Sequence, residues 1–132
     1  TTTGTVTVAA ATQAIQETGT ATDSAVTPGV QKYHPSAAKA WVRFNSAGTI
    51  AASYNVSSIT DSGTGAFVVN FTVAFSSTSY AVSVTTDATA GTALFGFYHT
   101  QATGSVGITT LNSSFAVADP TSCTVICFGD QA

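Results

Sequence analysis

The sequence predicts an all-β fold: an antiparallel, jelly-roll-like β-sandwich of seven or eight strands, preceded by a short strand and a small helical connector. From residue 39 onward, apolar and polar residues alternate in short runs, as in strands that bury one face. Clusters of turn-forming residues separate these runs roughly every 8–12 residues, which is the spacing typical of sandwiches and barrels. Residues 61–65, Asp-Ser-Gly-Thr-Gly, are the clearest such cluster.

The first strand of the sandwich is expected at residues 40–44, with Ala40, Val42 and Phe44 on one face and Trp41 and Arg43 on the other. The runs at 50–59 and 66–73 flank the turn cluster and are expected to form a hairpin. The remaining strands are expected at residues 80–84, 93–99, 105–111, 115–117 and 124–128.

The first 35 residues have a different pattern. Residues 1–10 alternate weakly, with Val6 and Val8 on one face, and form an expected strand or arm. Residues 11–17 favour a helix capped by Thr12, and Thr27-Pro28 resembles the start of a second short helix. Because such short helices are unstable alone, the predicted organisation is an arm (1–10), a helical connector that packs against other copies (11–35) and a sandwich (36–132).

The composition excludes several classes of partner. The chain of 132 residues is 7% charged, against about 25% in typical soluble proteins, and has a net charge of −3. Its three cations are Lys32, Lys39 and Arg43. Nucleic-acid binding requires several phosphate-neutralising side chains on one face, so we expect no nucleic-acid partner. No apolar run approaches the roughly 20 residues of a spanning helix, so we expect no membrane insertion.

The two cysteines are predicted to be buried free thiols. Cys123 and Cys127 are four residues apart in an expected strand, which separates them by about 13 Å. A disulfide requires Cα atoms within about 7 Å, so they cannot bridge each other in a straight strand. A free cysteine behaves as a small apolar residue. A two-cysteine metal site and bonds to other chains are the alternatives.

The sequence favours a protein that is not an enzyme and has no cofactor or metal. All six acidic residues fall in expected loops, termini or the helical connector, where turn formation is their common role. A glycosidase needs two carboxylates about 5–9.5 Å apart, and Asp61 with Asp87 at one sandwich end is the alternative candidate. The chain has no Ser-His-Asp order to prefer, no phosphate-binding loop and no metal-ligand spacing.

Aromatic residues are the candidate binding groups, because exposed rings stack on sugars. For each ring a place in the core is favoured over exposure. The six rings weighed are Trp41, Tyr54, Tyr80, Phe95, Phe97 and Tyr98. The predicted receptor or glycan contacts are Tyr98, His99 and Gln101, because this segment is expected to run from a strand into a polar loop.

Several short motifs resemble known sequences. Residues 11–14 (ATQA), 17–20 (ETGT) and 25–28 (AVTP) are similar to the connector of bacteriophage tail fibres. The stretch from His34-Pro35 through AAKAWVRF (37–44) to ASYNV (52–56) resembles the start of a small β-domain at the C-terminal ends of phage and prophage fibre and spike proteins. The resemblance covers roughly residues 11–75.

The resemblance implies a homotrimeric appendage on the virion surface. The connector would lie at a three-fold junction, with Ile15, Val30, Tyr33 and His34 as the expected interface. A three-fold metal site formed by His34 is the alternative to a packing role for that residue. The arm would join other virion proteins, and the sandwiches would bind a bacterial surface glycan or protein multivalently. The alternative functions are a structural capsid decoration or assembly protein and, less favoured, a glycan-binding module or depolymerase fragment.

Overall fold

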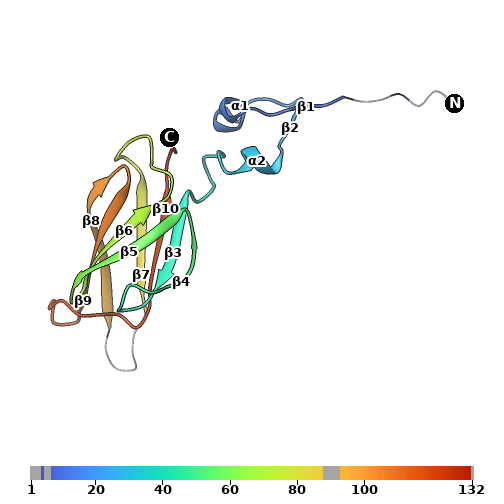
Figure 1. The fold of residues 1–132 in the computed structure, drawn as a ribbon. Helices are drawn as coiled ribbons and strands as arrows, with labels where there is room; N and C mark the ends of the chain where they lie inside the picture. Colours follow the sequence, from blue (N-terminus) through green and yellow to red (C-terminus); the bar gives the residue numbers. More distant parts are fainter. Residues whose placement is uncertain (1–3, 5–6, 88–92, 132) are drawn as a thin grey trace. The chain divides into compact units, whose positions relative to one another are not determined.

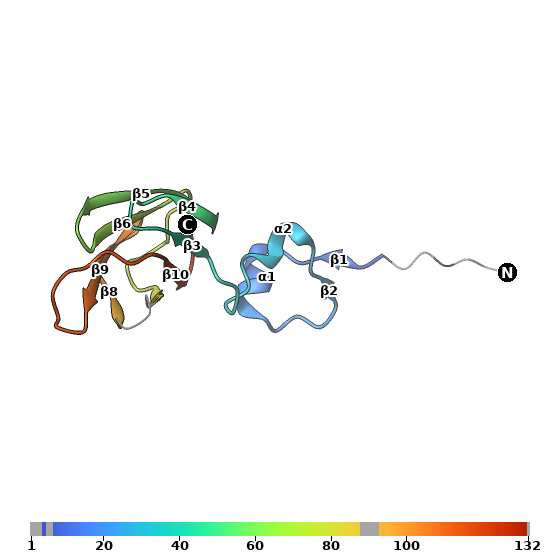
Figure 2. The ribbon, with the colours of Figure 1, turned by 90° about the horizontal axis from the view of Figure 1, so that it is seen from below.

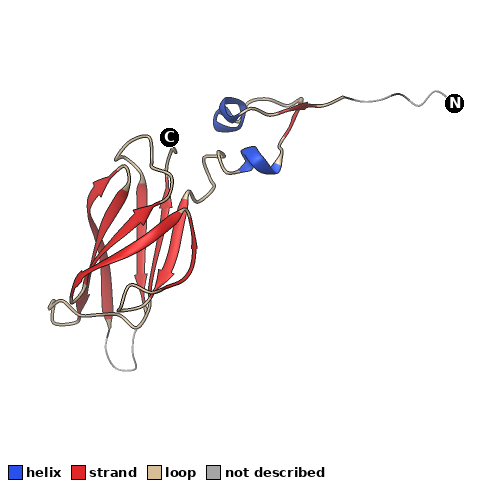
Figure 3. Ribbon diagram, in the orientation of Figure 1, coloured by secondary structure: helices blue, strands red, loops and turns tan. Residues whose placement is uncertain are grey.

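The computed structural model describes residues 4, 7–87 and 93–131. The chain divides into two compact units, Thr1–Ala37 and Ala38–Ala132. Among the described residues, both helices lie in the first unit, and the second consists of strands and loops (Figure 3).

The second unit is a β-sandwich, as predicted. Within the described residues, two antiparallel four-stranded sheets pack face to face (Figure 1). Figure 2 views the same unit roughly along its strands. The first sheet has the order β4 (Ile50–Tyr54), β3 (Ala40–Phe44), β10 (Cys123–Phe128), β7 (Ala81–Thr86). The second has the order β5 (Val56–Gly63), β6 (Ala66–Phe71), β9 (Ser105–Asn112), β8 (Leu94–Ala102).

The core lies between the two sheets and follows the alternation of each strand. In β3 the residues at 40, 42 and 44 share the buried face, and those at 41 and 43 share the exposed face. The division into these two faces was predicted, but not which of them is buried. The rings of Phe44 and Phe67 meet edge to face across the sheets, with centroids 5.2 Å apart. The buried apolar cluster consists of Ala40, Val42, Phe44, Phe67, Val69, Phe71, Phe75, Tyr80, Val106, Ile108, Cys123, Val125 and Cys127.

An aromatic group within this core involves the segment between β6 and β7. Phe75 stacks on Tyr80 with centroids 4.2 Å apart, and Phe71 meets both rings edge to face. The Tyr80 hydroxyl donates to the carbonyls of Ala102 and Ser105, each at 2.9 Å. The buried phenol therefore keeps hydrogen-bond partners, as a buried polar group requires.

The predicted single strand over residues 50–59 is wrong. It is two strands, because Asn55 has a left-handed backbone (φ 55°) and the chain passes there from one sheet to the other. Asn tolerates this conformation better than most residues. The side-chain amide of Asn55 makes hydrogen bonds where the backbone pairing is interrupted. Its nitrogen donates to the carbonyl of Val73, and its oxygen accepts from the backbone N–H of Val73. As a result Tyr54 faces outward beside Trp41, whereas Val56 packs against the core.

Three further strand predictions differ from the structure. The strand expected at 115–117 is a loop with one isolated bridge, and Phe115 has a left-handed backbone (φ 60°). The strand expected at 93–99 continues to Ala102 through a bulge near Thr100 (φ 44°). The strand expected to reach residue 73 ends at Phe71. The first two errors lie where a non-glycine residue has a left-handed backbone, and the third lies where the chain crosses from one sheet to the other.

Two glycines permit close approaches of the backbone. Gly65, with φ 66°, ends the β5–β6 turn, and a Cβ there would stand 2.5 Å from the carbonyl oxygen of Thr110. Gly96 in β8 faces Val84 of β7, whose Cγ1 would be 2.4 Å from an added Cβ. A side chain at Gly96 would therefore push apart the neighbouring edges of the two sheets.

The first unit contains two very short strands and two short helices. β1 (Ala9–Ala10) pairs in parallel with β2 (Ser24–Ala25). The helix α1 (Gln13–Thr18) begins at Thr12, whose Oγ1 accepts from the backbone N–H of Ile15, as the sequence predicted. The helix α2 (Pro28–Gln31) begins with Pro in its first turn, again as predicted. The strand expected around Val6 and Val8 is confined to residues 9–10 among those described, and Val6 lies outside them.

This unit buries little apolar surface by itself. Among its described residues, Ala11 and Gln16 are buried, whereas Val8 and Val26 are each more than half exposed. Short helices depend on tertiary packing for most of their stability. The exposed apolar side chains are therefore available for contact with another surface.

Candidate functional site

The predicted receptor contacts all lie in β8, but they do not form one patch. Tyr98 and His99 are exposed and, as neighbours in a strand, point to opposite sides of the sheet. Gln101 is half-buried, and its amide donates to the carbonyl of Tyr80 at 2.8 Å. The imidazole of His99 lies over Gly107. A Cβ added at Gly107 would be 2.5 Å from the Cε1 atom of His99. His99 thus presents one side of its ring at the outward face of the second sheet.

The predicted trimer contacts lie in or just after the short helices of the first unit. Ile15, Val30 and Tyr33 are half-buried, and His34 is exposed. The Nδ1 atom of His34 is 2.6 Å from the hydroxyl of Ser36. All four side chains retain accessible surface, which a contact between copies would require.

The carboxylates of the sandwich stabilise turns and loops. Asp61 accepts from the N–H of Gly63, Asp119 from that of Gly65, and Asp87 from that of Ser122. Asp130 accepts from the hydroxyl of Ser76. The turn-forming role that the sequence favoured is confirmed for Asp61, whereas Asp87, Asp119 and Asp130 join segments that lie far apart in the sequence. Within residues 4, 7–87 and 93–131, no cluster of three or more His, Cys, Asp or Glu is placed to hold a metal ion.

The described part of the chain contains no helix that is long and apolar enough to cross a membrane.

The cysteines are free, buried and on the inward face of β10, as predicted. Burial raises the pKa of Cys123 to about 12, with a further contribution from the negative charge of Asp87. Burial also raises the pKa of Cys127 to about 12. A reactive cysteine needs a stabilised thiolate, so these thiols are structural apolar groups.

The raised thiol pKa values predict a loss of stability at alkaline pH. Between about pH 9 and pH 12 the unfolded chain loses thiol protons that the folded chain retains, so the free energy of unfolding falls as the pH rises. Below pH 9 this contribution is fully present. Desolvation raises the pKa of Tyr80 to about 12, which acts in the same direction above pH 10. We expect a loss on the order of 1 kcal/mol per pH unit for each thiol in that window.

Urea unfolding at pH 8, 9, 10 and 11 measures this slope. The matched control replaces both thiols, as Cys123→Ala with Cys127→Ala, and should show a flatter dependence on pH despite a lower starting stability. An unchanged free energy of unfolding from pH 8 to pH 11 in the original chain would contradict the prediction.

Most of the aromatic residues expected in the core are at the surface. Tyr80 is buried, and Tyr98 is exposed, as its predicted role in receptor contact requires. A place in the core was wrong for Trp41, Tyr54, Phe95 and Phe97, which are all exposed. Alternation shows which residues of a strand share a face, but not which face meets the other sheet. The exposed rings therefore became evident only when the sheets were assembled.

One group of exposed rings lies on the outward face of the first sheet. Trp41 of β3 and Tyr54 of β4 are directly paired, and are 38% and 40% exposed. Arg43 follows two residues after Trp41 on the same face. The sequence analysis placed Trp41 and Arg43 on one face, but the break at Asn55 concealed that Tyr54 joins them.

A second group lies at the second sheet and its adjoining loop. Phe95 and Phe97 of β8 are exposed, and Phe115 stacks against Phe95 with centroids 6.4 Å apart. Phe115 is 76% exposed, and Val117 beside it in the loop is also exposed. We refer to Phe95, Phe97, Phe115 and Val117 as the phenylalanine patch. The sequence analysis missed Phe115, because it lies within a segment expected to be a strand.

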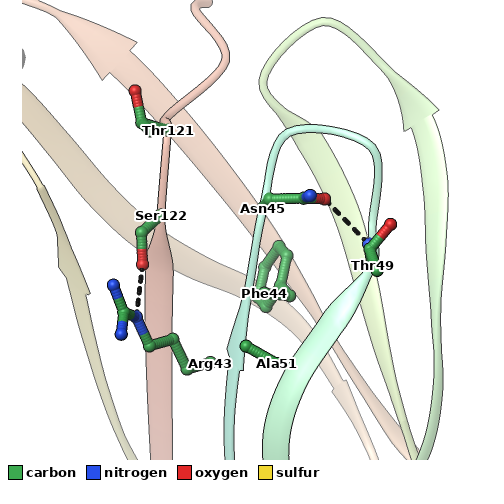
Figure 4. A pocket seen from close by; sticks show the side chains of 7 residues that line it. All are labelled: Arg43, Phe44, Asn45, Thr49, Ala51, Thr121 and Ser122. Atoms are coloured by element: carbon green, nitrogen blue, oxygen red, sulfur yellow. Dashed lines mark hydrogen bonds between the residues drawn. The ribbon is translucent and has the colours of Figure 1, made fainter.

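A shallow pocket of about 240 Å³ opens at the end of β3 (Figure 4). Arg43 points toward Ser122, and its Nε donates to the Ser122 hydroxyl at 2.9 Å. Asn45 points toward Thr49 and accepts from the backbone N–H groups of Ala47 and Thr49. The pocket is lined by Arg43, Phe44, Asn45, Thr49, Ala51, Thr121 and Ser122.

The fold and these surfaces define a mostly β protein with a two-sheet sandwich that presents aromatic and polar groups outward. Comparison with protein-family models, curated proteins and solved structures yields no match.

Proposed function

We propose that the chain is part of a bacteriophage virion appendage, a fibre or spike, that attaches to the host cell surface by multivalent binding. The observation that carries the proposal is the exposure of aromatic rings on a sandwich whose carboxylates are engaged in turns. Exposed aromatic surface is typical of interaction sites. Carboxylates that accept hydrogen bonds from backbone N–H groups have a structural role, which favours binding over catalysis in this proposal.

The small core of the first unit supports the homotrimer in this proposal. Ile15, Val30 and Tyr33 are half-buried in a unit whose described buried residues are Ala11 and Gln16. Sister copies packed around a three-fold axis would cover these side chains, with His34 at the rim. In the same proposal, the arm of residues 1–10 joins other virion proteins. The proposed type of β-sandwich is jelly-roll-like.

We assign the phenylalanine patch to contact with a neighbouring copy of the sandwich. Its four members are apolar and exposed, and Phe115 is held by stacking on Phe95. A cluster of this kind contrasts with the first sheet, whose outward face mixes rings with hydroxyl groups and a guanidinium. Burying apolar surface against an identical copy is the usual role of such a patch in a homo-oligomer.

Attachment would then depend on three weak sites acting together. Each sandwich would bind a bacterial surface glycan or protein, and the trimer would gain avidity because the second and third contacts are intramolecular. The chain would lie on the surface of the virion, where these sites are accessible.

Two measurements test the proposal. Sedimentation of the purified chain should show a trimer, and electron microscopy of particles labelled through this chain should place it at the outer end of an appendage. The trimer should also adsorb to host cells. A monomer in sedimentation, or a label inside the particle, would overturn the proposal. A trimer on the capsid that never adsorbs to cells would instead identify a decoration or assembly protein.

A further inference from the structure

We propose that the outward face of β3 and β4 is a binding site for an acidic saccharide, a uronate or a sialylated glycan. This inference rests on the proposed function and specifies the ligand class and the residues that bind it. The residues are Trp41 and Tyr54 as a stacking platform and Arg43 as the group that binds the carboxylate.

The strand register places these three side chains together. Trp41 pairs with Tyr54 on one side, and Arg43, two residues further along β3, pairs with Ala52 on the same side. Consecutive residues on one face of a strand are about 7 Å apart. Two rings and a guanidinium thus lie on adjacent rows of one outward surface.

The surroundings of these groups suit a flat ligand. The residues opposite Arg43 in the neighbouring strands are Ala52 and Thr124, both of which have short side chains. This shallow surface of short side chains beside two aromatic rings can contact the apolar face of a pyranose ring. The hydroxyl groups around the pyranose ring remain available for hydrogen bonds. An apolar peptide anchor would need a deep pocket, and an added strand would bind the edge of a sheet rather than its face.

Arg43 determines the charge of the ligand. The second unit has two cations, Lys39 and Arg43, and Lys39 is only 2% exposed, whereas Arg43 is exposed. Its Nε donates to Ser122, whose own N–H is bonded to Asp87 at 2.7 Å, so one edge of the guanidinium is held in place. A guanidinium oriented in this way binds a carboxylate through its terminal N–H groups.

The pocket beside Arg43 extends the site past the rings. Its volume of about 240 Å³ is smaller than the roughly 300–1,000 Å³ of sites that enclose drug-sized ligands. It therefore accommodates one sugar unit or its acidic substituent. Thr49, Thr121 and Ser122 line this space with hydroxyl groups, which match those of a glycan.

Tryptophan fluorescence tests the proposal directly, because Trp41 is the single tryptophan of the chain. The probes are oligogalacturonate, a glucuronate disaccharide and sialyllactose, with methyl-esterified oligogalacturonate and lactose as neutral counterparts. We expect at least one acidic probe to change the emission of Trp41 with a dissociation constant in the millimolar range or below, and the neutral counterparts to bind on the order of tenfold more weakly.

Variants separate the roles of the residues. Arg43→Gln should lower the affinity for the acidic probe on the order of tenfold, and Arg43→Lys should recover part of it. Trp41→Ala should abolish binding measured by calorimetry. Val68→Ala, on the outward face of the other sheet, is the matched control and should bind as the original chain does.

Three results would overturn the inference: no acidic probe alters Trp41, the neutral probes bind equally well, or Arg43→Gln binds unchanged. Attachment to cells distinguishes this failure from failure of the proposed function. If trimers of the original chain adsorb to cells and Trp41→Ala trimers adsorb equally, the saccharide site is wrong and the attachment function stands. If the original trimer does not adsorb to cells but binds an acidic probe at Trp41, the attachment function is wrong and the saccharide site stands.

Discussion

Removing residues 1–37 should leave a folded, monomeric sandwich that attaches to host cells on the order of 10²- to 10⁴-fold less tightly than the complete chain. The buried apolar cluster lies entirely within Ala38–Ala132, so the sandwich retains its core after the truncation. The first unit supplies the contacts that hold the proposed trimer together. The phenylalanine patch adds contact only between sandwiches that the first unit already holds close, so without that unit each site binds singly. Sedimentation gives the oligomeric state, and adsorption of labelled protein to cells gives the apparent affinity.

A foreign three-stranded coiled coil in place of residues 1–37 is the control for this experiment. It should restore most of the lost affinity, because avidity requires only that three sandwiches be held together. If the coiled-coil fusion remains as weak as the monomer, the first unit contacts the receptor itself. Equal affinity of the truncated and complete chains would contradict the multivalent mechanism.

Phe67→Ala should destabilise the sandwich by about 3–5 kcal/mol. Phe67 is buried near the start of β6, and its ring joins the two sheets through the edge-to-face contact with Phe44. Its removal loses the transfer energy of the ring and leaves a cavity that the packed strands fill only partly. Such a loss is a large part of the 5–15 kcal/mol typical of a domain. Urea unfolding monitored by circular dichroism measures the change.

The neighbouring residue offers a matched control. Val68 is half-buried and points to the outward face of the same strand, so Val68→Ala should cost less than about 1.5 kcal/mol. A double-mutant cycle with Phe44→Ala should give a coupling energy of about 0.5–1.5 kcal/mol between the two rings. Equal losses in Phe67→Ala and Val68→Ala would show that β6 does not bury the face described above.

Several features of this protein followed from short stretches of sequence. The helix starts at Thr12 and at Thr27-Pro28 depend on residues within one turn, and both were predicted. The β-sandwich followed from period-two alternation and from the spacing of turn residues. The free state of Cys123 and Cys127 followed from strand geometry, and their burial from the apolar character of a free thiol. All of these are local properties, because each depends on residues that are close together in the sequence.

The candidate sites could not be obtained in this way. The sequence analysis chose Tyr98, His99 and Gln101 as one exposed segment, whereas the structure turns Tyr98 and His99 to opposite sides and bonds Gln101 to the Tyr80 carbonyl. It also expected core positions for rings that are exposed, including Trp41 and Tyr54. The opposite directions of Tyr98 and His99 follow from strand alternation, but the hydrogen bond of Gln101 and the exposure of Trp41 and Tyr54 depend on contacts between strands distant in sequence.

The sequence by itself determined the class of fold, the caps of the short helices and the alternation within each strand, because each depends on residues a few positions apart. Only the tertiary structure decided that the chain changes sheets at Asn55, and that Tyr54 lies beside Trp41 and Arg43 on an outward surface. The physical reason is that the pairing of strands and the packing of one sheet on the other determine which face of a strand is buried, and both involve residues far apart in the chain.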